Sequence, residues 1–441
     1  MLRLPEGPVD AGGHDLVVAG GGMAGICAAV TAARLGCRVA LINDRPVLGG
    51  NNSSEVRVHL GGKIGAGLHK ELGNLIKEFG PGRKGNAQPA DFYEDGKKLE
   101  FVQRENNLRL FLNHRVVKVH ASGGEIQSIV AKHIETGAES SFSARCFSDC
   151  TGDGTVGFLA GADYRMGREG RGEFGESIAP EQGDALVMGA SVQWYSKKES
   201  RPAPFPVFKY GVEFTEENCE RVTKGEWTWE TGMNYNQITD SERIRDYGLL
   251  VVFSNWSFLK NELKNNRDYE NLGLDWVAYI AGKRESRRLM GDYILKQDDI
   301  QKNVFHEDAS FATTWSIDLH FPAPVNSMRF PGNEFKAATK HLSIQPYAVP
   351  YRCLYSRNVD NLFMAGRNIS VTHVALGTVR VMRTTGMMGE VVGMAAYLCK
   401  KHNTTPRKIY QSHLDELKRL MEEGAGKKGV PDNQQYNEVP R

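Results

Sequence analysis

The sequence predicts an α/β fold in which a parallel-sheet domain, extended by a β-meander, is interrupted by an inserted α+β domain. Three observations lead to this prediction. An apolar strand at Leu16–Ala19 runs into a glycine-rich turn and a helical stretch, three alternating strands follow between residues 110 and 147, and a second strand, loop and helix occupies residues 361–382. Such alternation of strands and helices is typical of a sheet with parallel strands.

The length and charge of the chain limit its partners. It has 441 residues, of which 40% are hydrophobic, so it can build two domain cores. Lys and Arg total 55, Asp and Glu total 53, and the net charge is +2. A near-neutral chain lacks the electrostatic footprint for binding nucleic acid or an anionic membrane surface. We therefore expect small-molecule partners, no nucleic acid and no membrane.

The N-terminus and the cysteines favour the cytoplasm. The opening stretch MLRLPEGPVDAGG is interrupted by prolines and a glutamate, so it does not read as a secretory signal, although a processed precursor would look the same. No apolar run approaches the roughly 20 residues of a membrane-spanning helix. The seven cysteines are scattered and include no C-x-x-C pair. This pattern fits a reducing compartment and predicts no zinc or iron–sulfur site.

The segment DLVVAGGGMAGICAAV, residues 15–30, predicts a dinucleotide-binding unit. A strand leads into a GxGxxG turn and a helix, and a second buried strand follows at residues 38–42, which is the βαβ spacing that a lone GxGxxG lacks. The first glycine permits the turn, the second lets the backbone approach a pyrophosphate, and the third allows close helix–strand packing. A glycine-rich turn in an ordinary α/β protein is the alternative. The expected contacts are Gly20, Gly22, Met23, Ala24 and Gly25.

The end of the second strand departs from the usual pattern. An acid is expected there to bind the adenosine ribose, but Asn43 occupies the position and Asp44 follows it. An amide can still bond a ribose hydroxyl, and Asp44 reaches it if the strand ends one residue later. Because no arginine stands at position 43, nothing demands a 2′-phosphate.

The next loop, RPVLGGNNSSEVRVH at residues 45–59, suits a long cofactor. Its glycine pair and its polar side chains could wrap the molecule and direct hydrogen-bonding groups at its ring. A solvated turn is the alternative. The expected contacts in this loop are Arg45, Gly49, Gly50, Asn51 and Ser53.

A β-meander is predicted from strands at Leu110–Val119, Gln127–His133 and Ser141–Phe147, joined by the turns ASGGE and ETGAE. The last strand continues into FSDCTGDGTVGFLAGADY, where a turn of small residues again permits close approach to a ligand. The expected contacts are Val117, Thr151, Gly152 and Asp153.

These motifs, in this order, resemble the FAD-dependent oxidoreductases of the two-dinucleotide-binding-domain flavoprotein superfamily. Its signature combines the GxGxxG unit, the second glycine pair, the D-x-T-G turn after a meander and a late Gly-Arg strand and helix, all present here. A nearer likeness is to proteins distantly related to the heterodisulfide reductase A flavoprotein, through GKRESRRLMGDY and AGRNISVTHVALGTVRVM. The resemblance implies FAD, with NAD as the alternative. The clustered iron–sulfur cysteines are missing, and no histidine precedes the glycine pair, so we expect noncovalent FAD alone.

The late unit at residues 361–382 is where this superfamily returns its C-terminal strand to the first sheet and passes the flavin. The resemblance implies that Gly366 lets the backbone pass the cofactor and that Arg367 lies near its phosphate. A helix beginning around residues 377–380 would direct its positive end at the negative charge of a reduced flavin. The expected contacts are Gly366, Arg367, Gly377, Val379, Arg380 and Val381.

The middle of the chain differs in composition, because all six tryptophans fall there and the prolines bunch. This predicts an inserted substrate or cap domain at residues 164–350. It would divide the FAD-binding domain into a first part at residues 1–163 and a second at residues 351–425, followed by a flexible tail at residues 426–441.

Hydride transfer between a substrate and FAD needs a group that takes a proton, and histidine suits that task near neutral pH. His373 is the first candidate, because it lies in the loop between Gly366 and the expected helix start. A structural loop histidine is the alternative. His320 in WSIDLH is the second, since strand alternation places Asp318 on the same face to orient it. A surface strand pair would look similar.

Arg57 and Arg284 are the remaining catalytic candidates. Arg57 belongs to an alternating stretch after the serine loop and could reach the flavin edge. The segment GKRESRRLMGDY reads as a helix with Arg284, Arg287 and Arg288 in one turn. Together they could bind a carboxylate, a phosphate or sugar hydroxyls, although charge pairing at a domain interface is the favoured alternative.

The leading hypothesis is an oxidoreductase that passes a hydride between a small polar substrate and FAD, with an unidentified electron acceptor. A carbohydrate is suggested by the tryptophan-rich middle region. The alternatives are a lyase-type protein in which flavin is a structural aid, and an FAD-containing subunit that relays electrons. A homo-oligomer is compatible with the sequence.

Overall fold

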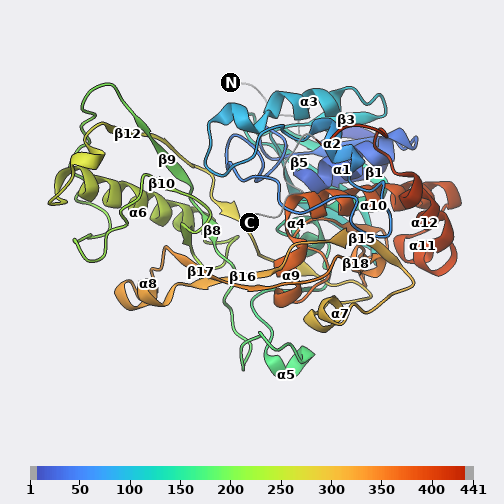
Figure 1. Ribbon diagram of the computed structural model, residues 1–441. Coiled ribbons are helices and arrows are strands. Elements are labelled where there is room, and N and C mark those ends of the chain that lie inside the picture. Colours follow the sequence, from blue (N-terminus) through green and yellow to red (C-terminus); the bar gives the residue numbers. More distant parts are fainter. Residues whose placement is uncertain (1–6, 433–441) are drawn as a thin grey trace.

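A computed structural model describes residues 7–432, arranged as two lobes (Figure 1). The larger lobe carries the main sheet with helices α1 and α10, and the smaller lobe, at the left of the figure, carries helix α6. Residues 433–441 of the predicted tail lie outside the described residues. The preceding part is packed, since the Lys427 N–H donates to Glu78 at 2.7 Å and Asp432 pairs with Arg383 at 2.7 Å.

The larger lobe is built on a seven-stranded sheet with the order β3-β2-β1-β6-β5-β4, and β19 also pairs with β6. Strands β3, β2, β1 and β19 run parallel to their neighbours, whereas β4, β5 and β6 form an antiparallel meander. The prediction of an α/β fold with a Rossmann-like parallel sheet and a β-meander is therefore confirmed. The strands are β1 (Val9–Ala19), β2 (Val39–Ile42), β3 (Leu108–Phe111), β4 (His114–Ser122), β5 (Glu125–His133), β6 (Glu139–Asp149) and β19 (Leu362–Met364).

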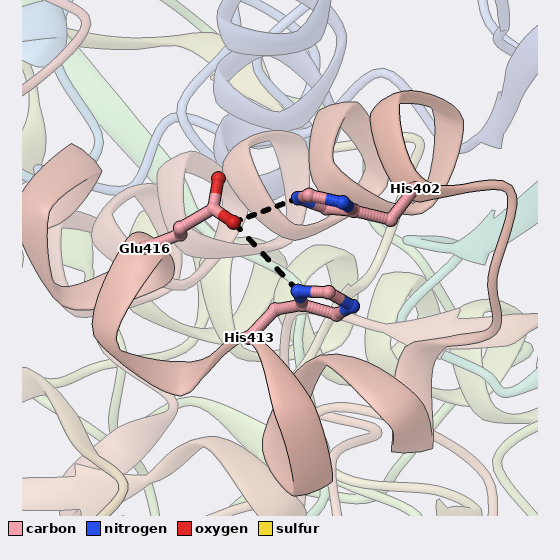
Figure 2. A group of neighbouring side chains, drawn as sticks. All are labelled: His402, His413 and Glu416. Carbon is pink, nitrogen blue, oxygen red and sulfur yellow. Dashed lines mark ion pairs between the residues drawn. The ribbon is translucent and has the colours of Figure 1, made fainter.

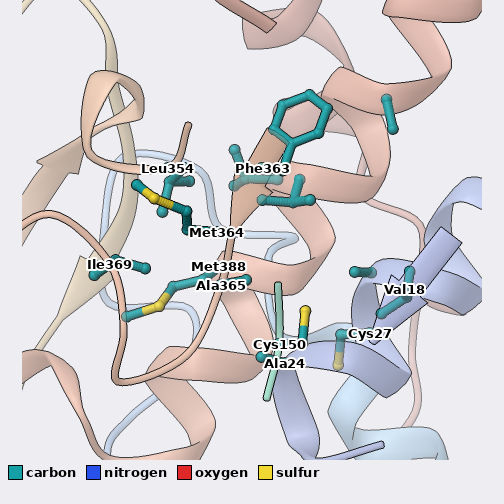
Figure 3. Packing of buried hydrophobic residues seen from close by; sticks show 14 of the residues in the cluster. Val18, Ala24, Cys27, Cys150, Leu354, Phe363, Met364, Ala365, Ile369 and Met388 are labelled. Atoms are coloured by element: carbon teal, nitrogen blue, oxygen red, sulfur yellow. The ribbon is translucent and has the colours of Figure 1, made fainter. Parts of the chain in front are cut away.

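Helices α1 (Met23–Arg34) and α10 (Met382–His402) pack against each other beside this sheet. The contact is close because small residues face one another: a Cβ added to Gly389 would lie 2.1 Å from the Ala24 carbonyl oxygen. Figure 3 shows Ala24 and Cys27 of α1 near Met388 of α10, beside Val18 of β1. The end of the chain is thereby fixed to the first βαβ unit.

The meander differs from its prediction at the first strand. Residues 110–119 do not form one strand, because the chain turns after Phe111 and Asn113 takes φ +57°, in the left-handed region that asparagine tolerates. Strand β3 pairs with β2, and β4 begins the meander at His114. The predicted apolar run concealed this turn.

The smaller lobe has its own hydrophobic core, whose buried members all lie between Val192 and Phe335. Trp194 is fully buried between Trp229 and Trp256, with ring centroids 5.3 and 5.6 Å away. Leu295 and Phe311 contribute instead to the core of the larger lobe, and β16 also adds Ile317 and Leu319 to that core. The boundaries 164–350 stay a prediction. The elements here are β8 (Ala190–Ser191), β9 (Trp194–Lys198), β10 (Lys224–Gly225), β11 (Glu230–Thr231), α6 (Ser241–Asn261), β12 (Leu272–Val277), β13 (Gly282–Lys283), β16 (Ile317–Pro322), α8 (Pro324–Arg329) and β17 (Ala337–Leu342).

The remaining elements are short and complete the two lobes. They are α2 (Asn74–Phe79), α3 (Asp95–Gln103), α4 (Thr155–Leu159), β7 (Tyr164–Arg165), α5 (Arg171–Phe174), β14 (Arg288–Leu289), α7 (Gln297–Gln301), β15 (Ala309–Thr313), β18 (Tyr347–Pro350), α9 (His373–Val379), α11 (Pro406–Ser412) and α12 (Leu414–Glu423), with 3₁₀ turns at Ala90–Tyr93, Arg267–Tyr269 and Tyr351–Cys353. Within residues 7–432, none of the helices has both the length and the apolar character needed to cross a bilayer.

Two helix predictions were wrong. The segment GKRESRRLMGDY is extended, with β13 at one end and β14 in its middle. Both short strands pair with others from distant parts of the chain, and this tertiary pairing overrides helix propensity. The late helix starts at His373 rather than around residue 377, because Thr372 caps it by accepting a hydrogen bond from the Ala375 N–H. It ends at Val379, and α10 is a separate helix.

Candidate functional site

A cavity of about 750 Å³ lies where the two lobes meet. The glycine-rich turn after β1 and the late Gly366-Arg367 loop both line it, together with side chains of the smaller lobe such as Trp227 and Arg284. The two distant units that the sequence singled out therefore face one space. All the predicted cofactor contacts lie on its wall except Gly25, Val117, Gly377 and Val379.

The turn after β1 is shaped by contacts that leave no room for side chains. Gly20 has φ +107°, and an added Cβ would lie 2.2 Å from the Cys150 carbonyl oxygen. An added Cβ on Gly25 would lie 1.7 Å from the Gly20 carbonyl oxygen, so Gly25 serves helix packing behind the wall. Helix α1 begins next, with Gly22 as its N-cap and no side-chain cap. Its first N–H groups are thus open to an anion in the cavity.

Asn43, at the end of β2, stabilises the glycine-rich turn after β1 by hydrogen bonds. The Asn43 Oδ1 accepts a hydrogen bond from the Gly21 N–H at 3.0 Å, and its Nδ2 donates to the carbonyl oxygens of Arg45 and Val47 at 2.9 Å. These bonds join two loops of the wall. Asp44, also on the wall, is exposed and is the carboxylate at the position where an adenosine ribose is expected.

The glycine-pair loop lies directly beside the first turn. Gly22 and Gly49 form a parallel bridge, and the Gly49 N–H donates to the Gly21 carbonyl at 2.8 Å. Asn51 donates to the Lys283 carbonyl at 3.0 Å, which ties the loop to the smaller lobe. Ser53 donates to the Gly50 carbonyl at 2.7 Å. Asn51 and Ser53, which were expected to reach a ligand, thus also stabilise the conformation of the loop.

The D-x-T-G turn is linked to the late loop through Asp153. Its carboxylate accepts a hydrogen bond from Arg367 at 3.0 Å and from Ser286 at 2.8 Å, and it also pairs with Lys283. Burial would raise the pKa of Asp153, but Lys283 and Arg367 outweigh that effect and lower it to about 2. An anionic Asp153 therefore holds Arg367 at the wall.

Three of the predicted contacts face elsewhere. In β4 the side chain at the wall is Val116, whereas Val117 is 42% exposed, because neighbouring strand residues point to opposite faces. Gly377 lets α9 approach β16, since an added Cβ would lie 2.9 Å from the Asp318 backbone nitrogen. Val379 is fully buried in the core. The helix N-terminus at the cavity belongs to α10, and Val381 and Met382 line the wall there. Val381 is the N-cap residue, and no side chain caps this helix end by a hydrogen bond.

A polar cluster around His320 occupies the part of the wall formed by the smaller lobe. His320 Nδ1 lies 2.7 Å from Glu230 Oε2, and its Nε2 lies 3.5 Å from Asp318 Oδ1. Strand alternation in β16 does place Asp318 and His320 on one face, as the sequence predicted. Arg284 lies 3.4 Å from Glu230, and Arg380 lies 3.1 Å from Asp318.

Both carboxylates of this cluster are anionic. Burial would raise the pKa of Glu230, but Arg284 and His320 bring it down to about 2. Burial acts on Asp318 in the same direction, and His320 and Arg380 hold its pKa well below the usual range. Sequence reasoning missed Glu230, because its two-residue strand shows no periodicity and its partners are distant in the chain.

Among the residues that the structure describes, His373 is not one of those that line the cavity. It is 3% exposed, and its Nδ1 lies 2.9 Å from Glu285, which also pairs with the buried Arg288. The His373 N–H donates to Glu169 at 2.8 Å. Burial would raise the pKa of Glu285, but His373 and Arg288 lower it. This buried ion cluster fixes the start of α9, so His373 has a structural position.

The arginine candidates also separate. Arg57, at φ +64°, packs over Trp276 at 3.9 Å and donates to the Ser54 carbonyl, and it is not among the described wall residues. Arg284 is on the wall, but its guanidinium donates to Ser191 and to the Trp227 carbonyl. Arg287 instead covers Phe158 at 3.7 Å, so the predicted group of three guanidinium groups does not form.

FAD fits this wall. The α1 N-terminus is open for a pyrophosphate, Gly366 with φ +120° brings backbone to the surface, and the α10 N-terminus offers a positive dipole end to an anionic ring. The buried Nε atoms of Arg367 and Arg380 have no hydrogen-bond partner among the described residues. Both arginines line the cavity wall.

Comparisons with known proteins agree with this reading. The sequence profile of the family described as "FAD dependent oxidoreductase" matches residues 15–421. No curated protein sequence matches the chain.

Three similar solved structures share 12–13% identity with this chain. They include the flavin-dependent monooxygenase PieE in complex with FAD and substrate (13% identity, 44% of this chain and 36% of that chain, TM-score 0.29) and the myxobacterial chondrochloren halogenase CndH (13%, 93% and 79%, TM-score 0.40). A geranylgeranyl bacteriochlorophyll reductase-like protein from Thermoplasma acidophilum is a third (12%, 93% and 83%, TM-score 0.38).

These TM-scores are low, so the assignment rests on the family match over most of the chain. The narrower resemblance to heterodisulfide reductase A stays a prediction. The chain belongs to the FAD dependent oxidoreductase family, and its cofactor is FAD.

Proposed function

We propose that the protein transfers a hydride between a small polar substrate and noncovalent FAD, with His320 Nε2 accepting the proton that the substrate loses. The observation that carries this proposal is the 2.7 Å contact between Glu230 and His320 in the same cavity that the FAD-binding segments line. A base held by a buried carboxylate at a cofactor cavity is the arrangement that general base catalysis requires.

Glu230 sets the tautomer of His320. Because Glu230 is anionic and fully buried, it accepts a hydrogen bond from Nδ1–H, which leaves the Nε2 lone pair for a proton. Trp227 packs edge-on against the imidazole at 5.4 Å and restricts its rotation. The ring is thus held in one orientation before a substrate arrives.

Charged side chains of both signs surround His320. Glu230 and Asp318 stabilise the imidazolium that forms on proton transfer. Arg284, beside Glu230, and Arg380, beside Asp318, offset the negative charge of these carboxylates. We assign Arg284 as a positioning residue for Glu230, because its donors are already used within the protein.

FAD, when bound, supplies the two-electron acceptor for the hydride. The protein would hold it through the N-termini of α1 and α10, with Asp44 at the ribose and Val116 against the adenine end. Asp153 and Arg367 join the two loops that enclose it. Residues of the smaller lobe, such as Trp227 and Arg284, form another part of the same wall.

The wall favours a polar substrate with hydroxyl groups. Trp227 and Trp315 offer flat apolar faces, while Gln237 and the Asp318–Arg380 pair offer hydrogen-bonding groups. Aromatic faces beside hydrogen-bonding side chains suit a carbohydrate or a related polyol, which presents both apolar faces and hydroxyls.

The direct test is anaerobic reduction of the bound flavin. Purified protein should be yellow, with one FAD per chain, and a panel of sugars, polyols, amino acids and hydroxy acids should include a compound that bleaches the flavin absorbance. A protein that dithionite bleaches but that none of the panel reduces would favour an electron-relay subunit.

His320→Ala should slow reduction by the active compound by about 10²- to 10⁴-fold without releasing FAD. Glu230→Gln, which keeps the shape but not the charge, should slow it less and shift its pH profile. His120→Ala, on the exposed outer part of β4, is the matched control. Unchanged reduction by the His320 variant would rule out its role.

A further inference from the structure

Figure 2 shows two histidines and a glutamate that meet near the end of α10. None of the three is among the described residues that line the FAD cavity. His402 is the last residue of α10, His413 lies between α11 and α12, and Glu416 is in the first turn of α12. Each side chain is about a quarter exposed. His402 Nε2 lies 2.8 Å from Glu416 Oε1, and His413 Nδ1 lies 3.7 Å from the same oxygen.

These separations match a metal polyhedron. Bonds of about 2.0–2.1 Å to imidazole nitrogen or carboxylate oxygen, at tetrahedral angles, place neighbouring ligand atoms about 3.3 Å apart. The distances of 2.8 and 3.7 Å lie on either side of that value, and all three ligand atoms lie within 4.8 Å of one another. Two imidazoles with one carboxylate are also a donor set that Zn²⁺ and similar divalent ions prefer.

We propose that His402, His413 and Glu416 form a binding site for one divalent transition-metal ion, with Zn²⁺ as the best match, leaving the fourth position to water. The sequence predicted no metal site from its cysteine spacing. It did not reveal this one, because the two histidines belong to different helical elements that only tertiary packing brings together.

Binding requires a modest rearrangement of the rings. The two imidazoles are now stacked, with centroids 3.8 Å apart and planes only 11° from parallel. A metal lies near the plane of each imidazole that binds it, so at least one ring must turn about its Cβ–Cγ bond. Their partial exposure leaves space for this turn, and the exchange of stacking for coordination gives the site an empty and a loaded form.

Lys401 competes with a metal ion for the Glu416 carboxylate. Its ammonium lies 2.6 Å from Glu416 Oε2, on the oxygen that does not face the histidines. Because the ammonium also repels an incoming cation, its removal should favour the metal.

A metal at this site would stabilise the packing of α10 against α12 and would take no part in the redox reaction. Helix α10 begins at the FAD cavity with Met382 and ends at His402, and its 21 residues span about 30 Å. A metal joining its far end to α12 would fix the helix that carries the cavity-facing N-terminus. Metal loading should therefore raise thermal stability without being needed for flavin reduction.

The test is titration of tag-free, metal-stripped, FAD-loaded protein with Zn²⁺ by calorimetry, with Co²⁺ absorption reporting nitrogen and oxygen ligation. We expect saturable binding of one ion per chain and a rise in melting temperature. His402→Ala, His413→Ala and Glu416→Gln should each weaken binding by at least about tenfold. Their flavin content should stay normal, which shows that they fold.

Two further variants sharpen the outcome. Lys401→Ala should bind Zn²⁺ several-fold more tightly, whereas His120→Ala should bind as the parent does. The proposal is overturned if the parent protein shows no saturable site, if binding survives in both histidine variants, or if Lys401→Ala weakens it.

Discussion

The contact between α1 and α10 gives the sharpest stability prediction, through Gly389→Ala. In an unhindered helix, replacing glycine by alanine stabilises by about 0.5–1 kcal/mol. At Gly389 the new Cβ would lie 2.1 Å from the Ala24 carbonyl oxygen and 2.9 Å from the Ala28 nitrogen. Both neighbours are backbone atoms, so no side-chain rotation relieves the clash and the two helices must separate.

The expected magnitude follows from these opposing terms. Overpacking a well-packed interior costs about 1–3 kcal/mol, and a backbone contact this short belongs at the upper end. After the gain in helix propensity, the net loss should be about 2 kcal/mol. For a domain of about 150–250 residues this corresponds to a fall in melting temperature of about 4–8 °C.

The assay is thermal unfolding at saturating FAD, with Gly96→Ala as the matched control. Gly96 is exposed in helix α3 and has no neighbouring atom within 4 Å of an added Cβ, so that change should be neutral or stabilising. Gly389→Ala should also weaken FAD binding, because α10 carries Val381 and Met382 at the cavity wall. A Gly389→Ala protein that melts at or above the parent temperature would refute this account of the helix contact.

Three other predictions concern the cofactor site and the core. Val116→Ala should raise the FAD dissociation constant several-fold in a fluorescence titration while Val117→Ala leaves it unchanged, and an equal effect at both positions would mean that the β4 face is misassigned. Asp153→Asn should weaken FAD binding by about tenfold, because Arg367 loses its anionic partner, and retention of the parent affinity would remove Asp153 from the site. Burial raises the pKa of Glu390 to about 8, so the folded state keeps its proton where the unfolded chain has lost it. The stability that this protonation contributes is therefore fully present below about pH 4.5 and is lost as pH rises toward about 8. In urea unfolding across this range, the free energy of unfolding of Glu390→Gln should decline less than that of the parent. Parallel curves for the two proteins would contradict the shift.

Much of the cofactor site could be predicted because it depends on backbone conformations that a few consecutive residues determine. Gly20 and Gly366 adopt positive φ, and the spacing of the glycines dictates a strand, a turn and a helix N-terminus whatever surrounds them. Family resemblance then ordered these units along one cofactor. The sheet followed from the buried apolar strands, although the turn at Asn113 was hidden within one of them.

The substrate side was harder to predict because its residues meet only through long-range pairing. Glu230 comes from a two-residue strand, His320 from β16 and Arg284 from the loop after β13. His373 looked catalytic from its place in the sequence, yet α9 begins there and buries it among Glu285 and other ion partners. Sequence could name the histidines but could not choose between them.

The sequence by itself determined the FAD family, the parallel sheet and the glycine turns, because each depends on a few consecutive residues whose conformational limits are intrinsic. Tertiary structure alone decided which of the two candidate histidines, His320 or His373, lines the cavity, where α9 and α10 divide, and that GKRESRRLMGDY is extended. The physical reason is that burial and electrostatic pairing depend on neighbours from distant segments, and the free energy of those contacts exceeds the preferences of any short stretch of chain.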